Sequence, residues 1–200
     1  MWKGKNEIQP HIHHRRSIRL PRYDYSQRGA YFVTVCTQKR FCLFGDVVDG
    51  KMALNDAGRM VKKWYFGLED KFPDILCDEY VIMPNHFHAI IITVGADLRV
   101  CLDERGEPDV MGEHHKMGEP HNMGEHKGSP LHRVVQWFKT MTTNEYIRGV
   151  KQNGWQPFPG KLWQRNYYEH IIRNENELNR IREYIINNPL KWATDENYGH

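Results

Sequence analysis

Two consecutive apolar segments, residues 75–83 and 86–94, constrain the fold more than any other feature of this 200-residue sequence. Both are rich in the β-branched and aromatic residues that favour strands, and only Pro84-Asn85 separates them. A third segment of this kind, YFVTVCT at residues 31–37, is also expected to form a strand. The sequence therefore predicts a sheet built on these three strands.

Turn and capping residues place the next elements between these strands. Asp49-Gly50 is a turn dipeptide that predicts a hairpin joining residues 43–48 to residues 51–54. Asn55 or Asp56 can cap a helix that runs to about Lys71. That helix carries apolar residues at helical spacing, namely Met60, Val61, Trp64 and Leu68.

Two more helices are predicted in the second half of the chain. One spans residues 131–149, with an apolar face formed by Val134, Val135, Phe138, Met141 and Ile147. The other begins at Asn174, where Glu177 follows at capping-box spacing, and ends at Pro189. Its apolar stripe consists of Leu178, Ile181 and Ile185. Residues 164–173 are expected to be short and partly extended. This order of elements predicts an α+β fold, with an antiparallel sheet covered by helices.

One domain, residues 30–192, accounts for this pattern. We expect residues 1–29 to form a basic N-terminal arm and residues 193–200 to form a tail. The domain is interrupted at about residues 97–130, where a six-residue unit repeats from Met111, Met117 and Met123. This stretch is rich in Gly, His and Glu and has no apolar period, so a flexible surface loop is expected.

Positive charge is concentrated near the N-terminus. The first 40 residues hold nine lysines and arginines but two acidic residues, although the net charge of the chain is +3. Such an arm suits phosphate contact, and a solvated tail explains it equally well. No apolar run is long enough to span a membrane, and the N-terminus lacks the apolar core of a secretory signal, so a cytoplasmic protein is expected.

His86-Phe87-His88 lies in a predicted strand. Side chains of a strand alternate between its faces, so both imidazoles should point the same way and Phe87 should enter the opposite layer. Two imidazoles in this arrangement can bind one divalent ion. Taken alone, the pattern is more often incidental than a metal site.

Tyr184 and Asn188 lie four residues apart in the last predicted helix and should share a face. The amide oxygen of Asn188 is a possible third metal ligand. Packing of Tyr184 on the sheet, with Asn188 as a helix C-cap, explains the same residues without chemistry. A mixed aromatic and basic cluster suits base stacking and phosphate contact, and a structural role for Trp163 and Tyr167 is equally open. Its members are Trp163, Gln164, Arg165, Tyr167, Tyr168 and His170.

Taken together, these motifs resemble the REP-associated tyrosine transposases, relatives of the single-tyrosine transposases of small insertion sequences. The resemblance rests on the HFH strand preceded by Met83-Pro84-Asn85 and on WQRNYYEHIIRNE followed by YIINNP. It extends to RRSIRLPRYDYSQRGAYFVTVCT and VVQWFKTMTT, and so covers roughly residues 15–95 and 130–192. The repeat loop at residues 111–128 is a departure from the family pattern.

The resemblance implies a ferredoxin-like HUH endonuclease fold, in which single-stranded DNA is nicked through a 5′-phosphotyrosine link. It places the metal-binding pair on His86 and His88 and the nucleophile on Tyr184, and it matches Asn188 to the asparagine of the YIxxNP box. The implied cofactor is Mg²⁺ or Mn²⁺, of which Mn²⁺ accepts imidazole more readily.

The resulting hypothesis is a metal-dependent single-strand endonuclease and strand transferase that cuts at hairpin-forming palindromes. We expect DNA contacts from the cluster above and from the arm, through Arg15, Arg16, Arg19 and Arg22. Two alternatives stay open: a domesticated protein that binds DNA hairpins without mobilising them, and a phosphodiesterase that uses activated water, with Tyr184 structural. The sequence leaves a monomer and a homodimer equally open, and it does not give the target site.

Overall fold

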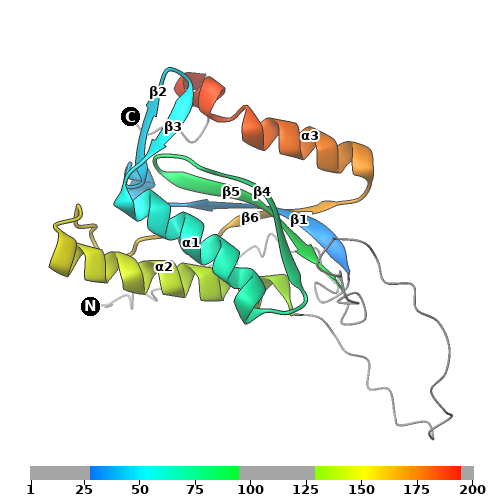
Figure 1. Cartoon of the computed structure of the whole chain (residues 1–200), viewed down its shortest axis with the longest axis horizontal. Helices are drawn as coiled ribbons and strands as arrows, with labels where there is room; N and C mark the ends of the chain where they lie inside the picture. The colour runs from blue at the N-terminus through cyan, green and yellow to red at the C-terminus, as the bar shows by residue number, and fades with distance from the viewer. Residues whose placement is uncertain (1–27, 95–128, 195–200) are drawn as a thin grey trace, which may run out of the picture.

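The computed structural model describes residues 28–94 and 129–194 (Figure 1). The main sheet has four strands in the order β4-β5-β1-β6, and every pair of neighbours is antiparallel. These strands are β1 (Gly29–Cys36), β4 (Ile75–Ile82), β5 (His86–Thr93) and β6 (Tyr168–Ile172). A separate hairpin consists of β2 (Gly45–Val48) and β3 (Lys51–Leu54).

Three α-helices cover the two faces of this sheet (Figure 1). Helices α1 (Asp56–Lys71) and α2 (Leu131–Asn153) pack on one face and against each other, whereas α3 (Glu175–Ile186) lies on the other face. The chain order β1-α1-β4-β5-α2-β6, combined with this strand order, is the ferredoxin-like topology of two interleaved β-α-β units. The predicted α+β fold is confirmed.

Local sequence signals account for the ends of these elements. Asn55 caps α1 by accepting a hydrogen bond from the Gly58 amide (2.9 Å), as the sequence predicts. The predicted hairpin is also confirmed: Asp49 and Gly50 have φ values of 50° and 70°, which the favoured two-residue hairpin turn requires. Asn174 caps α3 through the Glu177 amide (2.9 Å). The Glu177 carboxylate bonds the Arg173 amide rather than completing the expected capping box.

Two hydrophobic clusters lie on opposite faces of the sheet. The larger cluster joins α1 and α2 to the sheet, and Tyr31, Tyr65, Phe87 and Phe138 are among its buried members. The smaller cluster lies under α3, where the predicted stripe of Leu178, Ile181 and Ile185 packs on Phe32 and Ile90. The face of the sheet that carries α3 therefore has the thinner apolar layer, which leaves room there for polar side chains.

Several predicted boundaries and faces need correction. Helix α2 continues four residues past the predicted end, because its C-cap is Gly154 in the left-handed conformation (φ 67°). Ile147 was expected on its apolar face but is exposed, and Tyr146 is buried instead. Helix α3 ends at Ile186, before Pro189, and its C-cap is Asn187. The last described residues form a 3-10 helix, Pro189–Thr194.

Some expectations concern residues outside the described parts of the chain. These are most of the basic arm, including Arg15, Arg16, Arg19 and Arg22, the repeat loop at residues 111–128, and most of the tail. The division into arm, domain, loop and tail therefore stays a prediction. Among the helices of residues 28–94 and 129–194, none has the length and apolar character needed to cross a membrane.

Candidate active site

The two histidines lie side by side on strand β5. His86 pairs across the sheet with Cys36 and His88 with Thr34, and both imidazoles face α3. Their ring centroids are 4.5 Å apart at an interplanar angle of 71°. Phe87 points into the opposite layer, where it stacks on Phe138. The geometric part of the prediction is confirmed.

Each imidazole is oriented by a neighbouring side chain. Nδ1 of His86 lies 2.8 Å from Oδ1 of Asn85, and because an amide oxygen can only accept, the ring proton is on Nδ1. Nδ1 of His88 lies 2.7 Å from Oγ1 of Thr34. Hydrogen bonds of this kind fix the ring and the tautomer of histidines that bind metals. They leave Nε2 as the ligand atom of His86, and of His88 when its Nδ1 donates to Thr34.

Electrostatics keep His86 neutral. Burial and, to a smaller extent, the charge of Arg40 lower the pKa of His86 to about 3, against the opposing effect of a hydrogen bond with the Asn188 side chain. A neutral imidazole keeps the lone pair with which it binds a metal. His86 is therefore suited to act as a ligand and not as a charged acid at physiological pH.

Tyr184 approaches this pair from α3. Its hydroxyl lies 3.5 Å from Nε2 of His88, and the two ring centroids are 5.4 Å apart. Phe32 packs against both side chains. Its ring stacks on the His88 ring with centroids 5.3 Å apart and meets the Tyr184 ring edge-on with centroids 5.9 Å apart. The Tyr184 side chain is 39% exposed, so the hydroxyl borders both the histidines and solvent.

Asn188 completes the group, although it is not part of the helix as predicted. It follows the C-cap of α3, is buried, and lies next to His86. Its buried Oδ1 accepts no regular hydrogen bond from the described residues. The His86 ring interacts with this side chain outside regular hydrogen-bond geometry, and a bound cation would satisfy the amide oxygen more fully. The residues therefore fit a divalent ion held by two imidazoles and one amide oxygen.

Within residues 28–94 and 129–194, no cluster of three His, Cys, Asp or Glu side chains offers a competing metal site. Two imidazoles and one amide oxygen bring no negative charge to a bound ion. Any positive charge that the ion retains would be available to a bound phosphate.

Arg40 is a basic residue of this site that the motifs did not single out. It follows β1 in a short 3-10 turn, Gln38–Arg40, where Lys39 and Arg40 have positive φ values of 55° and 56°. Such values are unusual for residues other than glycine and are retained where the surrounding structure requires them. The Asn85 amide donates to the carbonyl of Arg40 (3.3 Å), and one guanidinium nitrogen lies 3.8 Å from Sγ of Cys36. The turn therefore holds a positive charge beside the His86 end of the site.

Tyr168, a member of the predicted aromatic and basic cluster, lies on the face of the sheet that carries the histidines. It pairs with Thr34 across β6 and β1, so it shares the face of the sheet that carries His88. Its ring is 53% exposed and meets Phe32 edge-on at 6.2 Å. The alternation of β6 relative to β1 would have placed it here, but the sequence did not show which strands are neighbours.

The predicted DNA-binding cluster is divided between the two faces of the sheet. Trp163 is buried against Phe44 and Phe138 and donates to Thr142 (2.9 Å), and Tyr167 packs against the same core. His170 lies on the α3 side and bonds Glu177 (2.8 Å). Trp163, Tyr167 and His170 therefore have structural partners, whereas Arg165 is exposed.

Arg165 borders an open cavity of about 350 Å³ between α2 and the segment before β6. Two lysines also line it, Lys139 from α2 and Lys161 from the segment before β6, and the cavity has no acidic residue among its lining side chains. Lys139 donates to the carbonyls of Gln164 (2.7 Å) and Arg165 (3.1 Å), and burial together with Lys161 lowers the pKa of Lys139 to about 8. The cavity lies on the α2 side of the sheet, and the amide of Gln164 in its lining bonds the carbonyl of Cys36, the residue that pairs with His86.

The fold and the site define a class of protein, namely a ferredoxin-like sheet that bears a histidine pair opposite a tyrosine. Comparison with known proteins shows the family. The chain is 38% identical over 189 residues to a protein of Haemophilus influenzae (strain ATCC 51907 / DSM 11121 / KW20 / Rd) described as uncharacterized, with 94% of each chain covered. It belongs to the same family as that protein. No protein-family model matches the sequence.

Two solved structures are similar to this chain. One is a REP-associated tyrosine transposase bound to a REP hairpin, at 18% identity and a TM-score of 0.49, covering 86% of this chain and 73% of that one. The other is a putative transposase from Deinococcus radiodurans R1, at 14% identity and a TM-score of 0.41, covering 94% of this chain and 97% of that one.

Proposed function

We propose that this protein is a metal-dependent endonuclease and strand transferase of the HUH tyrosine type, acting on single-stranded DNA. One observation carries the proposal: the hydroxyl of an exposed tyrosine, Tyr184, lies 3.5 Å from Nε2 of a buried, oriented histidine, His88, whose neighbour on the same face is His86. A nucleophile beside a pair of side chains that can bind a metal is an arrangement suited to metal-assisted phosphoryl transfer to a tyrosine.

Tyr184 supplies the attacking atom. A bond forms between its phenolic oxygen and phosphorus, and the bond from phosphorus to the 3′ oxygen breaks. This leaves a 5′-phosphotyrosine and a 3′ hydroxyl. The phenolic proton passes to solvent, which reaches the partly exposed side chain, and the leaving oxygen takes a proton from water. The phosphodiester energy is kept in the new bond, so strand transfer needs no nucleotide.

Tyrosine ionises near pH 10 and is a weak nucleophile at neutral pH. His86, His88 and Asn188 would hold Mg²⁺ or Mn²⁺, which when bound polarises the scissile phosphate and favours attack. Asn85 and Thr34 orient the two imidazoles. Arg40 adds a fixed positive charge that favours the extra negative charge of the transition state.

The DNA strand is proposed to cross the α3 face of the sheet and the adjacent end of the strands. Tyr168 offers an exposed ring on which an unpaired base can stack. Lys161 and Arg165 offer phosphate contacts in the cavity on the α2 side of the sheet. A strand on this path must be single, because stacking on Tyr168 needs a base that is not paired. The arginines of the N-terminal arm stay candidates for binding the hairpin stem.

The test is to incubate the protein with a labelled DNA hairpin that carries a single-stranded flank, with Mn²⁺ or with a chelator, and to separate the products on a denaturing gel. We expect a covalent protein–DNA adduct and a free 3′ end in Mn²⁺ alone, with little cutting of a fully paired duplex. Equal cutting of the duplex would contradict the proposal. Tight hairpin binding with no adduct under any metal would favour the domesticated hairpin-binding protein, and cutting without an adduct would favour attack by water.

A further inference from the structure

Helix α3 rests on the sheet through an apolar stripe that does not fix its rotation. Leu178, Ile181 and Ile185 pack on Phe32 and Ile90, and such contacts are non-directional. Tyr184 lies at one flank of this stripe, next to Ile185. Rolling α3 about its axis would move the Tyr184 hydroxyl relative to His88 while keeping most of the apolar contact.

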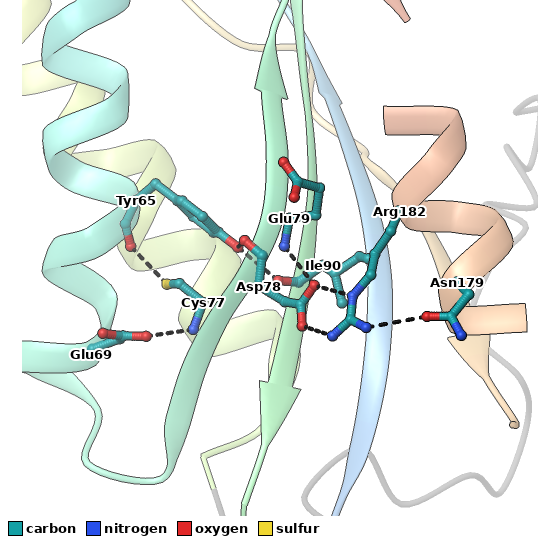
Figure 2. Close-up of polar contacts among 8 residues, drawn as sticks. All are labelled: Tyr65, Glu69, Cys77, Asp78, Glu79, Ile90, Asn179 and Arg182. Carbon is teal, nitrogen blue, oxygen red and sulfur yellow. Dashed lines mark hydrogen bonds and ion pairs between the residues drawn. The ribbon is translucent and has the colours of Figure 1, made fainter. Parts of the chain in front are cut away.

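A directional contact exists at the opposite flank of the helix. Arg182 donates to both carboxylate oxygens of Asp78 on strand β4, from Nε at 2.8 Å and from Nη2 at 2.5 Å (Figure 2). The third guanidinium nitrogen, Nη1, donates to Oδ1 of Asn179, one turn earlier (3.3 Å). The hydrogen bonds from Arg182 lower the pKa of Asp78, so the carboxylate is charged at neutral pH. A bidentate Arg–carboxylate ion pair of this kind fixes the relative orientation of the two groups as well as stabilising their contact.

Asp78 faces α3 because β4 contains a bulge. Cys77 pairs with Ile91 and Tyr80 with Ala89, so Asp78 and Glu79 together stand opposite Ile90. The extra residue lets Cys77 and Tyr80 both face α1, where Cys77 Sγ lies 3.1 Å from the carbonyl of Tyr65 and the Tyr80 ring packs on the Tyr65 ring.

The bulge is held from the α1 side as well. The Tyr65 hydroxyl is within hydrogen-bond distance of the carbonyls of Asp78 (3.1 Å) and Ile90 (2.7 Å), and Glu69 accepts from the Cys77 amide (2.6 Å) (Figure 2). These side chains satisfy backbone groups that the irregular ladder leaves open. Arg182 is therefore bound to a fixed point of the sheet and not to a loop.

We propose that the Asp78–Arg182 pair is a positioning device, which sets the rotation of α3 and thereby the place of the Tyr184 hydroxyl beside His88. This inference rests on the proposed function. Arg182 and Tyr184 are two residues apart, or roughly 200° around the helix. A roll of about 10° moves an atom that lies about 6 Å from the helix axis by about 1 Å. Misplacing a reacting group by that distance can slow a reaction about 100-fold.

The first test compares Arg182→Gln with a matched control. Arg182→Gln should slow adduct formation at saturating hairpin and Mn²⁺ by about 10- to 100-fold and change hairpin affinity by less than about twofold. Arg182→Lys, which keeps the charge, should recover part of the rate. Lys63→Gln removes an ion pair between α1 and α2, with Glu145 at 3.2 Å, and should leave the rate unchanged. A wild-type rate in Arg182→Gln, or equal slowing in Lys63→Gln, would overturn the inference.

The second test does not depend on catalysis. Amide hydrogen exchange in α3 should accelerate in Arg182→Gln while that in α1 stays unchanged, and the NMR signals of the His88 ring should shift. If the wild-type protein forms no adduct, the proposed function fails, but these measurements still decide whether the pair fixes α3. Unchanged exchange in α3 together with unchanged His88 signals would refute the positioning role.

Discussion

Thr34→Val removes the hydroxyl that bonds His88 and keeps the shape of the side chain. Both residues are buried, and the hydroxyl oxygen lies 2.7 Å from Nδ1. A buried polar atom that loses its partner costs about 1–3 kcal/mol. We therefore expect the variant to be about 2 kcal/mol less stable without metal, which corresponds to a fall in Tm of roughly 4–8 °C for a chain of this size.

The same change should weaken metal binding. His88 would keep its place on β5, but nothing would fix its tautomer or ring orientation. Loss of such an outer hydrogen bond typically lowers metal affinity about 10- to 100-fold, or roughly 1.4–2.8 kcal/mol. Calorimetric titration with Mn²⁺ measures this effect, and Thr34→Ser, which keeps the hydroxyl, should stay close to wild type.

Thr142→Val provides the matched control for this experiment. Thr142 is buried on α2 and accepts a hydrogen bond from Trp163 (2.9 Å), on the face of the sheet away from the histidines. It should lose a similar amount of stability and bind Mn²⁺ as wild type does. Wild-type Mn²⁺ affinity in Thr34→Val, or equal weakening in Thr142→Val, would refute the role given to Thr34.

Three further predictions concern other parts of the molecule. His86→Ala should abolish Mn²⁺ binding and nicking but leave a folded protein by circular dichroism; full nicking in metal-free buffer would count against the metal site. Gly149→Ala should lower the free energy of unfolding by about 1–3 kcal/mol in urea unfolding, because the added Cβ would lie 2.2 Å from the Trp155 ring. An unchanged free energy of unfolding would contradict close packing of Trp155 on Gly149. Hairpin affinity should fall as pH rises through about 8, because burial and Lys161 lower the pKa of Lys139 to about 8 and its positive charge is lost above that pH. The Lys139→Gln variant should not show this fall in affinity. If the fall persists in Lys139→Gln, another titrating group causes it.

Part of the site was predictable because it depends on local geometry. The alternation of side chains in β5 places His86 and His88 on one face and Phe87 on the other, whatever the rest of the fold. The apolar stripe of α3 likewise predicts which side of that helix meets the sheet. These relations are between residues a few positions apart, so the sequence contains them directly.

The partners of the site were not predictable in this way. Thr34 and Asn85 orient the histidines through strand neighbours and register, which depend on packing of the whole sheet. Tyr168 was in the predicted aromatic cluster, but its position beside Phe32 depends on the same register. Asp78 faces α3 through a bulge, and a single extra residue in an apolar strand has no clear sequence signal. For Trp163 the sequence left base stacking and a structural role equally open, and its burial in the core favours the structural role.

Tyr184→Phe shows whether Tyr184 is the nucleophile. The variant loses one oxygen and keeps the ring that packs on Phe32, so hairpin and Mn²⁺ binding should persist. Tyr168→Phe is the matched control, since Tyr168 is an exposed tyrosine beside the same Phe32 ring. Incubated with a labelled hairpin and Mn²⁺, Tyr168→Phe should form the covalent adduct and Tyr184→Phe should form none, because phenylalanine has no atom that can attack phosphorus. An adduct that persists in Tyr184→Phe, or that is lost in Tyr168→Phe alone, would contradict the account.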